Sequence, residues 1–177
     1  MIDPVVSLSI SVAFALLFAF SAIEKLQDRE SFLFHLDEYR LLPRFSVRAA
    51  GTLIIAAEMT IAILLLIHTP VYGVIAGALL LGLYTSGIFI NLLRGRTWMD
   101  CGCLGSEGEG LSYWLVLRNL ILLAVLMLVL LPTTERGLVW LDYFSLLFSV
   151  AAGVIAYIVF HLLLAADGRS KMWWGDR

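Results

Sequence analysis

The chain has 177 residues, of which 61% are hydrophobic and only 15% charged, and its mean hydropathy is +0.94. Soluble domains contain about 45–50% apolar and about 25% charged residues, so this composition excludes an ordinary water-soluble protein. A net charge of −2 gives no general basic field, so no nucleic acid partner is expected. Because long apolar runs alternate with short polar ones, we expect a single membrane domain over residues 1–177.

Five stretches are long and apolar enough to cross a bilayer core about 30 Å thick, which needs roughly 20 residues of helix. They cover residues 5–23, 49–67, 71–93, 114–131 and 143–164. The expected fold class is therefore an all-α integral membrane protein, a bundle of about five transmembrane helices. The residues before the first stretch include Asp3 and no Lys or Arg, so we predict a retained span rather than a cleaved signal peptide.

Residues 24–48 form the first connection with substantial content. They contain five basic and five acidic residues, with aromatic and leucine side chains among them, and Pro43 lies near the end. This pattern favours a short helix that lies at the membrane interface and ends at Pro43. An ordinary surface loop is the alternative.

The distribution of positive charge predicts a topology. With five spans, residues 24–48, residues 94–112 and the C-terminal tail share one side of the membrane. That side carries 11 Lys and Arg residues, counting Arg118, and the other side carries only Arg136. The positive-inside rule therefore places residues 94–112 in the cytoplasm.

Both cysteines of the protein lie in residues 94–112, which read RGRTWMDCGCLGSEGEGLS and contain five glycines. We call this segment the CGC loop. Cys101 and Cys103 are separated only by Gly102, so a disulfide between them closes a small ring. Departure from relaxed disulfide geometry makes such a bond easier to reduce than a structural one. Gly102 supplies backbone freedom for the ring. The pair is therefore a candidate catalytic or relay disulfide.

Two other interpretations of the cysteines remain open. Two soft sulfurs beside Met99 suit Cu(I) or half of a zinc site, but the loop has no His or third Cys, so we predict no metal. Alternatively, the thiols are inert, as buried cysteines commonly are.

Glu58 lies near the middle of the second stretch, where an ionised carboxylate costs on the order of 3 kcal/mol or more. It is a functional candidate by default, and the alternative is a neutral carboxyl group bonded to Tyr84 or Thr85. Several further polar residues lie at the span ends on the cysteine side, where they are candidates for one polar cluster or for snorkelling and capping roles. These residues are Glu24, Lys25, Asn91, Arg118 and Asn119.

These elements together resemble the methylamine utilisation protein MauE family, which belongs with DoxX-like redox-associated membrane proteins. The resemblance rests on AIEKLQD at residues 22–28, YRLLP at residues 39–43, the central Glu58 and DCGCLG at residues 100–105. It implies a four-helix redox core plus a C-terminal span, similar in layout to membrane oxidoreductases of the vitamin K epoxide reductase and DsbB type. It also implies a multi-pass protein of the bacterial inner membrane.

The resemblance makes Cys101 and Cys103 the redox pair, with Glu58, Lys25, Asp100 and Gly102 as supporting motif positions. It implies a role in maturing the disulfide-rich small (beta) subunit of methylamine dehydrogenase, beside a thioredoxin-like, MauD-like partner. No cofactor is evident in the sequence, and a membrane quinone is implied only by analogy. Periplasmic disulfides require periplasmic cysteines, which conflicts with the charge count. The charge-balanced first loop weakens that count, so we favour a periplasmic loop.

The sequence is therefore compatible with three candidate functions. The first is a membrane thiol–disulfide oxidoreductase acting through Cys101 and Cys103. The second is a non-catalytic membrane scaffold or chaperone for the immature subunit. The third is a metal or small-molecule transporter that uses Glu58, which the absence of an evident inverted repeat disfavours.

Overall fold

The structure, a computed structural model, describes residues 2–67, 70–95, 113–134, 137 and 139–175. Over these residues it consists of helices, with one isolated bridge between Ile2 and Thr133. In chain order the helices are α1 (Pro4–Gln27), α2 (Arg29–Glu38), α3 (Arg44–Leu66), α4 (Pro70–Leu93), α5 (Tyr113–Met127), the short 3-10 helix η1 (Leu128–Leu130) and α6 (Trp140–Gly175).

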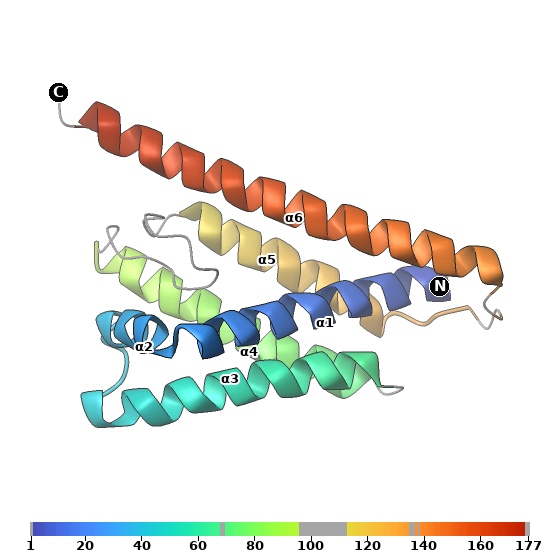
Figure 1. The fold of residues 1–177 in the computed structure, drawn as a ribbon, viewed down its shortest axis with the longest axis horizontal. Helices are drawn as coiled ribbons and strands as arrows, with labels where there is room; N and C mark the ends of the chain where they lie inside the picture. The colour runs from blue at the N-terminus through green and yellow to red at the C-terminus, as the bar shows by residue number, and fades with distance from the viewer. Residues whose placement is uncertain (1, 68–69, 96–112, 135–136, 138, 176–177) are drawn as a thin grey trace.

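Five helical segments have the length and composition of membrane spans: α1, α3, α4, α5 continued by η1, and α6. The predicted fold class, an all-α bundle with five such helices, is therefore confirmed, and the chain is a multi-pass membrane protein. The spans of α1, α3, α4 and α5 bury a larger share of their residues than the span of α6 does. In Figure 1, α6 lies along the outside of the other helices.

The centre of the bundle is an apolar cluster to which α1, α3, α4 and α5 all contribute. Its largest members include Phe14 and Phe18 from α1, Ile61 from α3 and Leu126 from α5. Gly77 of α4 lies against this cluster, because a Cβ atom there would be 3.2–3.4 Å from side chains of α1, α3 and α5. The small residue thus allows α4 to pass close to its three neighbours.

α3 and α4 form a tight antiparallel hairpin, as their short connection requires. They lie very close together at Gly73, where a Cβ atom would lie only 2.9 Å from the backbone nitrogen of Leu65. The two backbones can be this close only because residue 73 has no side chain.

The helices define two ends of the bundle. At one end, the Ile2 amide donates to the Pro132 carbonyl over 3.0 Å, and the Thr134 amide donates to the Ile2 carbonyl over 3.0 Å. The N-terminus and the chain between α5 and α6 therefore share this end. α2 and the last turn of α4 lie at the opposite end (Figure 1).

α2 is the short helix expected within residues 24–48. Asp28 caps it by accepting a hydrogen bond from the Ser31 amide at 3.1 Å, and the helix ends well before Pro43. Tyr39 follows α2 and packs against a small apolar cluster of α4 and α5. The Arg94 side chain donates to the Arg40 carbonyl over 3.5 Å. The chain after α2 therefore rests on the end of α4 that leads to residues 96–112.

Several helix ends differ from the sequence prediction: α3 begins at Arg44 rather than at residue 49, and α1 and α6 are also longer than their predicted spans. α1 continues one turn beyond residue 23 to Gln27, which brings Lys25 into the helix. α6 has 36 residues rather than the 22 expected for 143–164, so it is about 54 Å long. Both helices extend into polar residues, because hydrophobicity sets the bounds of a span while backbone hydrogen bonding sets the bounds of a helix.

Candidate functional site

The predicted site residues fall into two sets. Asp100, Cys101, Gly102 and Cys103 lie outside the described residues, between the end of α4 and the start of α5. Lys25 and Glu58 are both described, and the structure brings them together.

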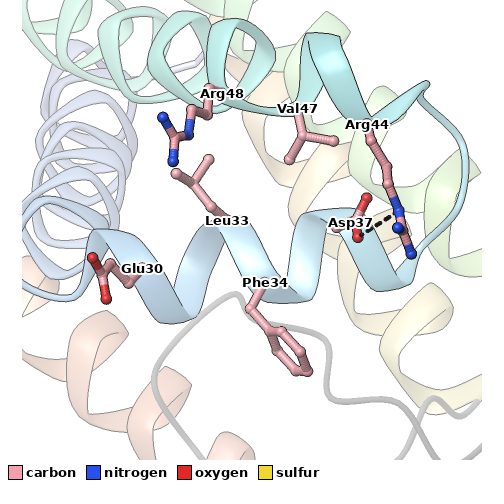
Figure 2. A pocket seen from close by; sticks show the side chains of 7 residues that line it. All are labelled: Glu30, Leu33, Phe34, Asp37, Arg44, Val47 and Arg48. Atoms are coloured by element: carbon pink, nitrogen blue, oxygen red, sulfur yellow. Dashed lines mark ion pairs between the residues drawn. The ribbon is translucent and has the colours of Figure 1, made fainter.

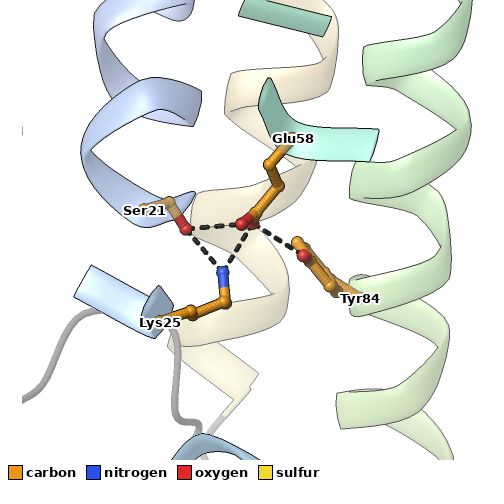
Figure 3. Close-up of polar contacts among 4 residues, drawn as sticks. All are labelled: Ser21, Lys25, Glu58 and Tyr84. Atoms are coloured by element: carbon orange, nitrogen blue, oxygen red, sulfur yellow. Dashed lines mark hydrogen bonds and ion pairs between the residues drawn. The ribbon is translucent and has the colours of Figure 1, made fainter. Parts of the chain in front are cut away.

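Lys25 and Glu58 form an ion pair inside the bundle. The Nζ atom of Lys25 lies 2.5 Å from Oε1 of Glu58, and only 5% of the Lys25 side chain and 0% of the Glu58 side chain are exposed. α1 supplies the lysine from its last turn and α3 supplies the carboxylate from its middle (Figure 3). The snorkelling interpretation of Lys25 is therefore wrong, because its ammonium group points into the protein.

Two hydroxyl groups complete the contacts of Glu58 Oε1. The Ser21 hydroxyl donates to it over 3.0 Å, and the Tyr84 hydroxyl of α4 donates over 2.7 Å. Lys25 Nζ also donates to Ser21 Oγ over 2.6 Å. Of the two partners considered for Glu58, Tyr84 makes the contact, while Thr85 bonds to the Leu81 carbonyl of its own helix. We call Ser21, Lys25, Glu58 and Tyr84 the polar cluster.

The polar cluster also connects α2 to the core. The ammonium group of Lys25 lies 5.5 Å from the ring centroid of Phe32 on α2 and 5.4 Å from that of Tyr84. Both distances are within the range of cation–π attraction. Side chains from α1, α2, α3 and α4 therefore meet around one buried charge pair.

The two oxygens of Glu58 have unequal surroundings. Oε1 accepts three hydrogen bonds, while Oε2 is buried and has no hydrogen-bond partner among the described residues. Removing either member of a buried pair leaves an uncompensated charge at a cost of about 3–5 kcal/mol. The polar cluster therefore fixes which helices lie next to one another and in what register.

A second set of buried polar residues lies on the two helices that flank residues 96–112. Asn91 is near the end of α4, and Arg118 and Asn119 are near the start of α5, all with 4% exposure or less. The Asn91 amide donates to the Gly87 carbonyl over 3.1 Å, and the Arg118 guanidinium lies 5.8 Å from the Tyr157 ring of α6. The two helices that flank the CGC loop therefore bury polar side chains close to it in the sequence.

A pocket of about 370 Å³ lies between α2 and the first turns of α3. Figure 2 shows the residues that line it: Glu30, Leu33, Phe34, Asp37, Arg44, Val47 and Arg48. Four charged side chains do not suit the apolar ring and tail of a quinone, because cofactor sites of that kind are predominantly hydrophobic. This pocket therefore does not fit the quinone suggested by analogy.

Among the residues that the structure describes, no three His, Cys, Asp or Glu side chains come together as a metal site would require.

Ser21 is the member of the polar cluster that the sequence interpretation missed. Its spacing of four residues from Lys25 places both on one face of α1, and this spacing was the available signal.

Comparison with known proteins places these residues in a family. The family model described as methylamine utilisation protein MauE matches residues 3–132. The methylamine utilization protein MauE of Paracoccus denitrificans is 36% identical over 128 residues, which cover 71% of this chain and 68% of the relative. The protein of the same name from Paracoccus versutus is 34% identical over 139 residues, covering 76% and 75%.

A third relative, MauE of Methylophilus methylotrophus, is 38% identical over 103 residues, covering 58% of this chain and 54% of the relative. No solved structure matches the chain. The matched residues 3–132 include the polar cluster and the CGC loop but end before α6. The chain belongs to the methylamine utilisation protein MauE family.

Proposed function

We propose that this membrane protein serves methylamine utilisation by maturing the disulfide-rich small (beta) subunit of methylamine dehydrogenase through thiol–disulfide exchange at Cys101 and Cys103. Family membership supports the role in methylamine utilisation. The observation that carries the chemistry is that both cysteines of the chain lie two positions apart in one glycine-rich loop inside the matched region.

The exchange needs no group beyond the two cysteines and a dithiol protein. A thiolate of the partner attacks one sulfur of the Cys101–Cys103 disulfide, and the other sulfur leaves as a thiolate. The second partner thiol then attacks the mixed disulfide. The partner loses two electrons and gains a disulfide, while Cys101 and Cys103 gain two electrons and take up the two protons. The reverse direction uses the same atoms.

The partner of this exchange is a thioredoxin-like, MauD-like protein, and the client is the small subunit. Disulfides persist outside the cytosol, so the proposal places the CGC loop on the periplasmic side of the bacterial inner membrane. The polar cluster supports the loop from a distance, because it holds α4, the helix that leads to the loop, against α1 and α3.

The test is to replace Cys101 and Cys103 together by Ser in a host that lacks the chromosomal gene. We expect the variant to reach the membrane in normal amount while the assembled dehydrogenase, measured by its activity in periplasmic extracts, falls to the level of the deletion strain. A matched control is Ser106→Ala, which changes a residue of the same loop but leaves both cysteines in place. It should retain wild-type activity.

Full dehydrogenase assembly with the double Ser variant would contradict the redox proposal. That result would favour the second function, a scaffold or chaperone that holds the immature subunit without chemistry.

A further inference from the structure

The pocket between α2 and α3 has an unusual lining for the surface of a membrane bundle. Two carboxylates, Glu30 and Asp37, and two guanidinium groups, Arg44 and Arg48, surround an apolar floor that includes Val47. Figure 2 shows Asp37 and Arg44 at one side of the pocket and Glu30 at the other. Opposite charges thus face one space of about 370 Å³.

The charged groups at the two sides of the pocket differ in whether they have an ion-pair partner. Arg44 Nε lies 3.7 Å from Asp37 Oδ2, so this pair compensates itself. Glu30 and Arg48 also line the pocket, but within the part of the chain that the structure describes their side chains form no ion pair with each other or with a third residue. The pocket therefore offers one negative and one positive group that are both available to a ligand.

The two helices that form this charged pocket also carry exposed apolar side chains. Phe34 lines it and is 61% exposed, Phe45 in the first turn of α3 is 88% exposed, and Leu53 further along α3 is 70% exposed. In a multi-pass membrane protein such outward apolar side chains contact acyl chains. A charged pocket next to an acyl-facing surface matches a ligand with a charged head and apolar tails.

From this arrangement we infer that the α2–α3 pocket binds the headgroup of a phospholipid that carries both a phosphate and a primary ammonium, as phosphatidylethanolamine does. Arg48 takes the phosphate, because the guanidinium fork suits phosphate oxygens. Glu30 accepts hydrogen bonds from the ammonium group. A quaternary ammonium has no N–H to donate and is bound by aromatic cages, whereas Phe34 is the only aromatic side chain that lines the pocket among the residues that the structure describes.

Native mass spectrometry of the full chain in detergent, mixed with equal amounts of phosphatidylethanolamine, phosphatidylcholine and phosphatidylglycerol, tests this inference. We expect phosphatidylethanolamine to be retained preferentially. Glu30→Gln should reduce that preference, and Arg48→Gln should reduce the retention of all three lipids because all carry the phosphate, each roughly two- to fivefold, the range expected for exposed charge pairs.

The matched controls are Glu38→Gln and Arg29→Gln, which remove charges of the same kind from positions on α2 outside the pocket lining. Both should keep the wild-type preference. Equal retention of phosphatidylethanolamine and phosphatidylcholine by the wild type would overturn the inference, because the carboxylate would then have no role. Preferential retention of phosphatidylglycerol would overturn it as well, since that result indicates a simple cationic site.

Discussion

Lys25 and Glu58, 33 residues apart in the sequence, meet over 2.5 Å inside the bundle with almost no exposure of either side chain. Their contact joins α1 to α3, and Tyr84 adds α4. A charge pair at this depth determines how the spans associate, because each helix alone would bury an uncompensated charge or a free donor.

Breaking the Lys25–Glu58 pair from one side should be more harmful than removing both charges. We expect Lys25→Met and Glu58→Gln each to lower the free energy of unfolding in detergent by about 3 kcal/mol. The combined Lys25→Met/Glu58→Gln variant should lose less than the sum of the two single losses, because no lone charge remains.

Denaturant titrations followed by circular dichroism measure these losses. Arg29→Met is the control, since Arg29 is an exposed cation four residues further along the chain, at the start of α2, and its loss should change stability by less than about 1 kcal/mol. Strictly additive losses in the double variant would show that the two side chains do not act as a pair.

The Tyr84 hydroxyl should contribute to stability separately from its ring. Tyr84→Phe removes the 2.7 Å hydrogen bond to Glu58 but keeps the ring beside Lys25. We expect a loss of about 1.5–3 kcal/mol, the usual contribution of a hydrogen bond to a charged group. The comparison is Tyr72→Phe, on the same helix, whose side chain is 68% exposed. If both variants unfold at the same denaturant concentration, the hydroxyl of Tyr84 contributes nothing.

The α3–α4 hairpin should not tolerate a methyl group at Gly73. Gly73→Ala places a Cβ atom 2.9 Å from the Leu65 backbone nitrogen, which cannot move aside without separating the helices. We expect a destabilisation of about 1–3 kcal/mol. Gly82→Ala on the same helix meets nothing within 4 Å and should be neutral. A thermal melt of both variants in the same detergent makes the comparison, and equal melting temperatures would contradict the packing described here.

Much of the fold follows from hydropathy alone, because the bilayer imposes a length on each apolar stretch. The short helix α2 was also predictable from the mixed charge and aromatic content before Pro43. The contact between Lys25 and Glu58 could not be predicted from the sequence, since it depends on how far α1 continues and on the rotation of α1 against α3. Lys25 at the end of an apolar stretch suggests snorkelling, and only the extra turn of α1 turns the side chain inward.

The cysteine pair is a different case. The CGC pattern was visible at once in the sequence, and it remains the central element of the proposed function. The charge count places the pair in the cytoplasm, while the proposed role requires it in the periplasm. The location and the redox state of the two sulfurs therefore test the proposed exchange.

The most direct measurement labels Cys101 and Cys103 in intact cells with a membrane-impermeant maleimide, with and without prior reduction. We predict labelling from outside that appears only after reduction, because the pair rests as a periplasmic disulfide. A Cys101→Ser/Cys103→Ser strain provides the blank. Labelling that appears only after the cells are opened would place the pair in the cytoplasm and contradict the proposed exchange.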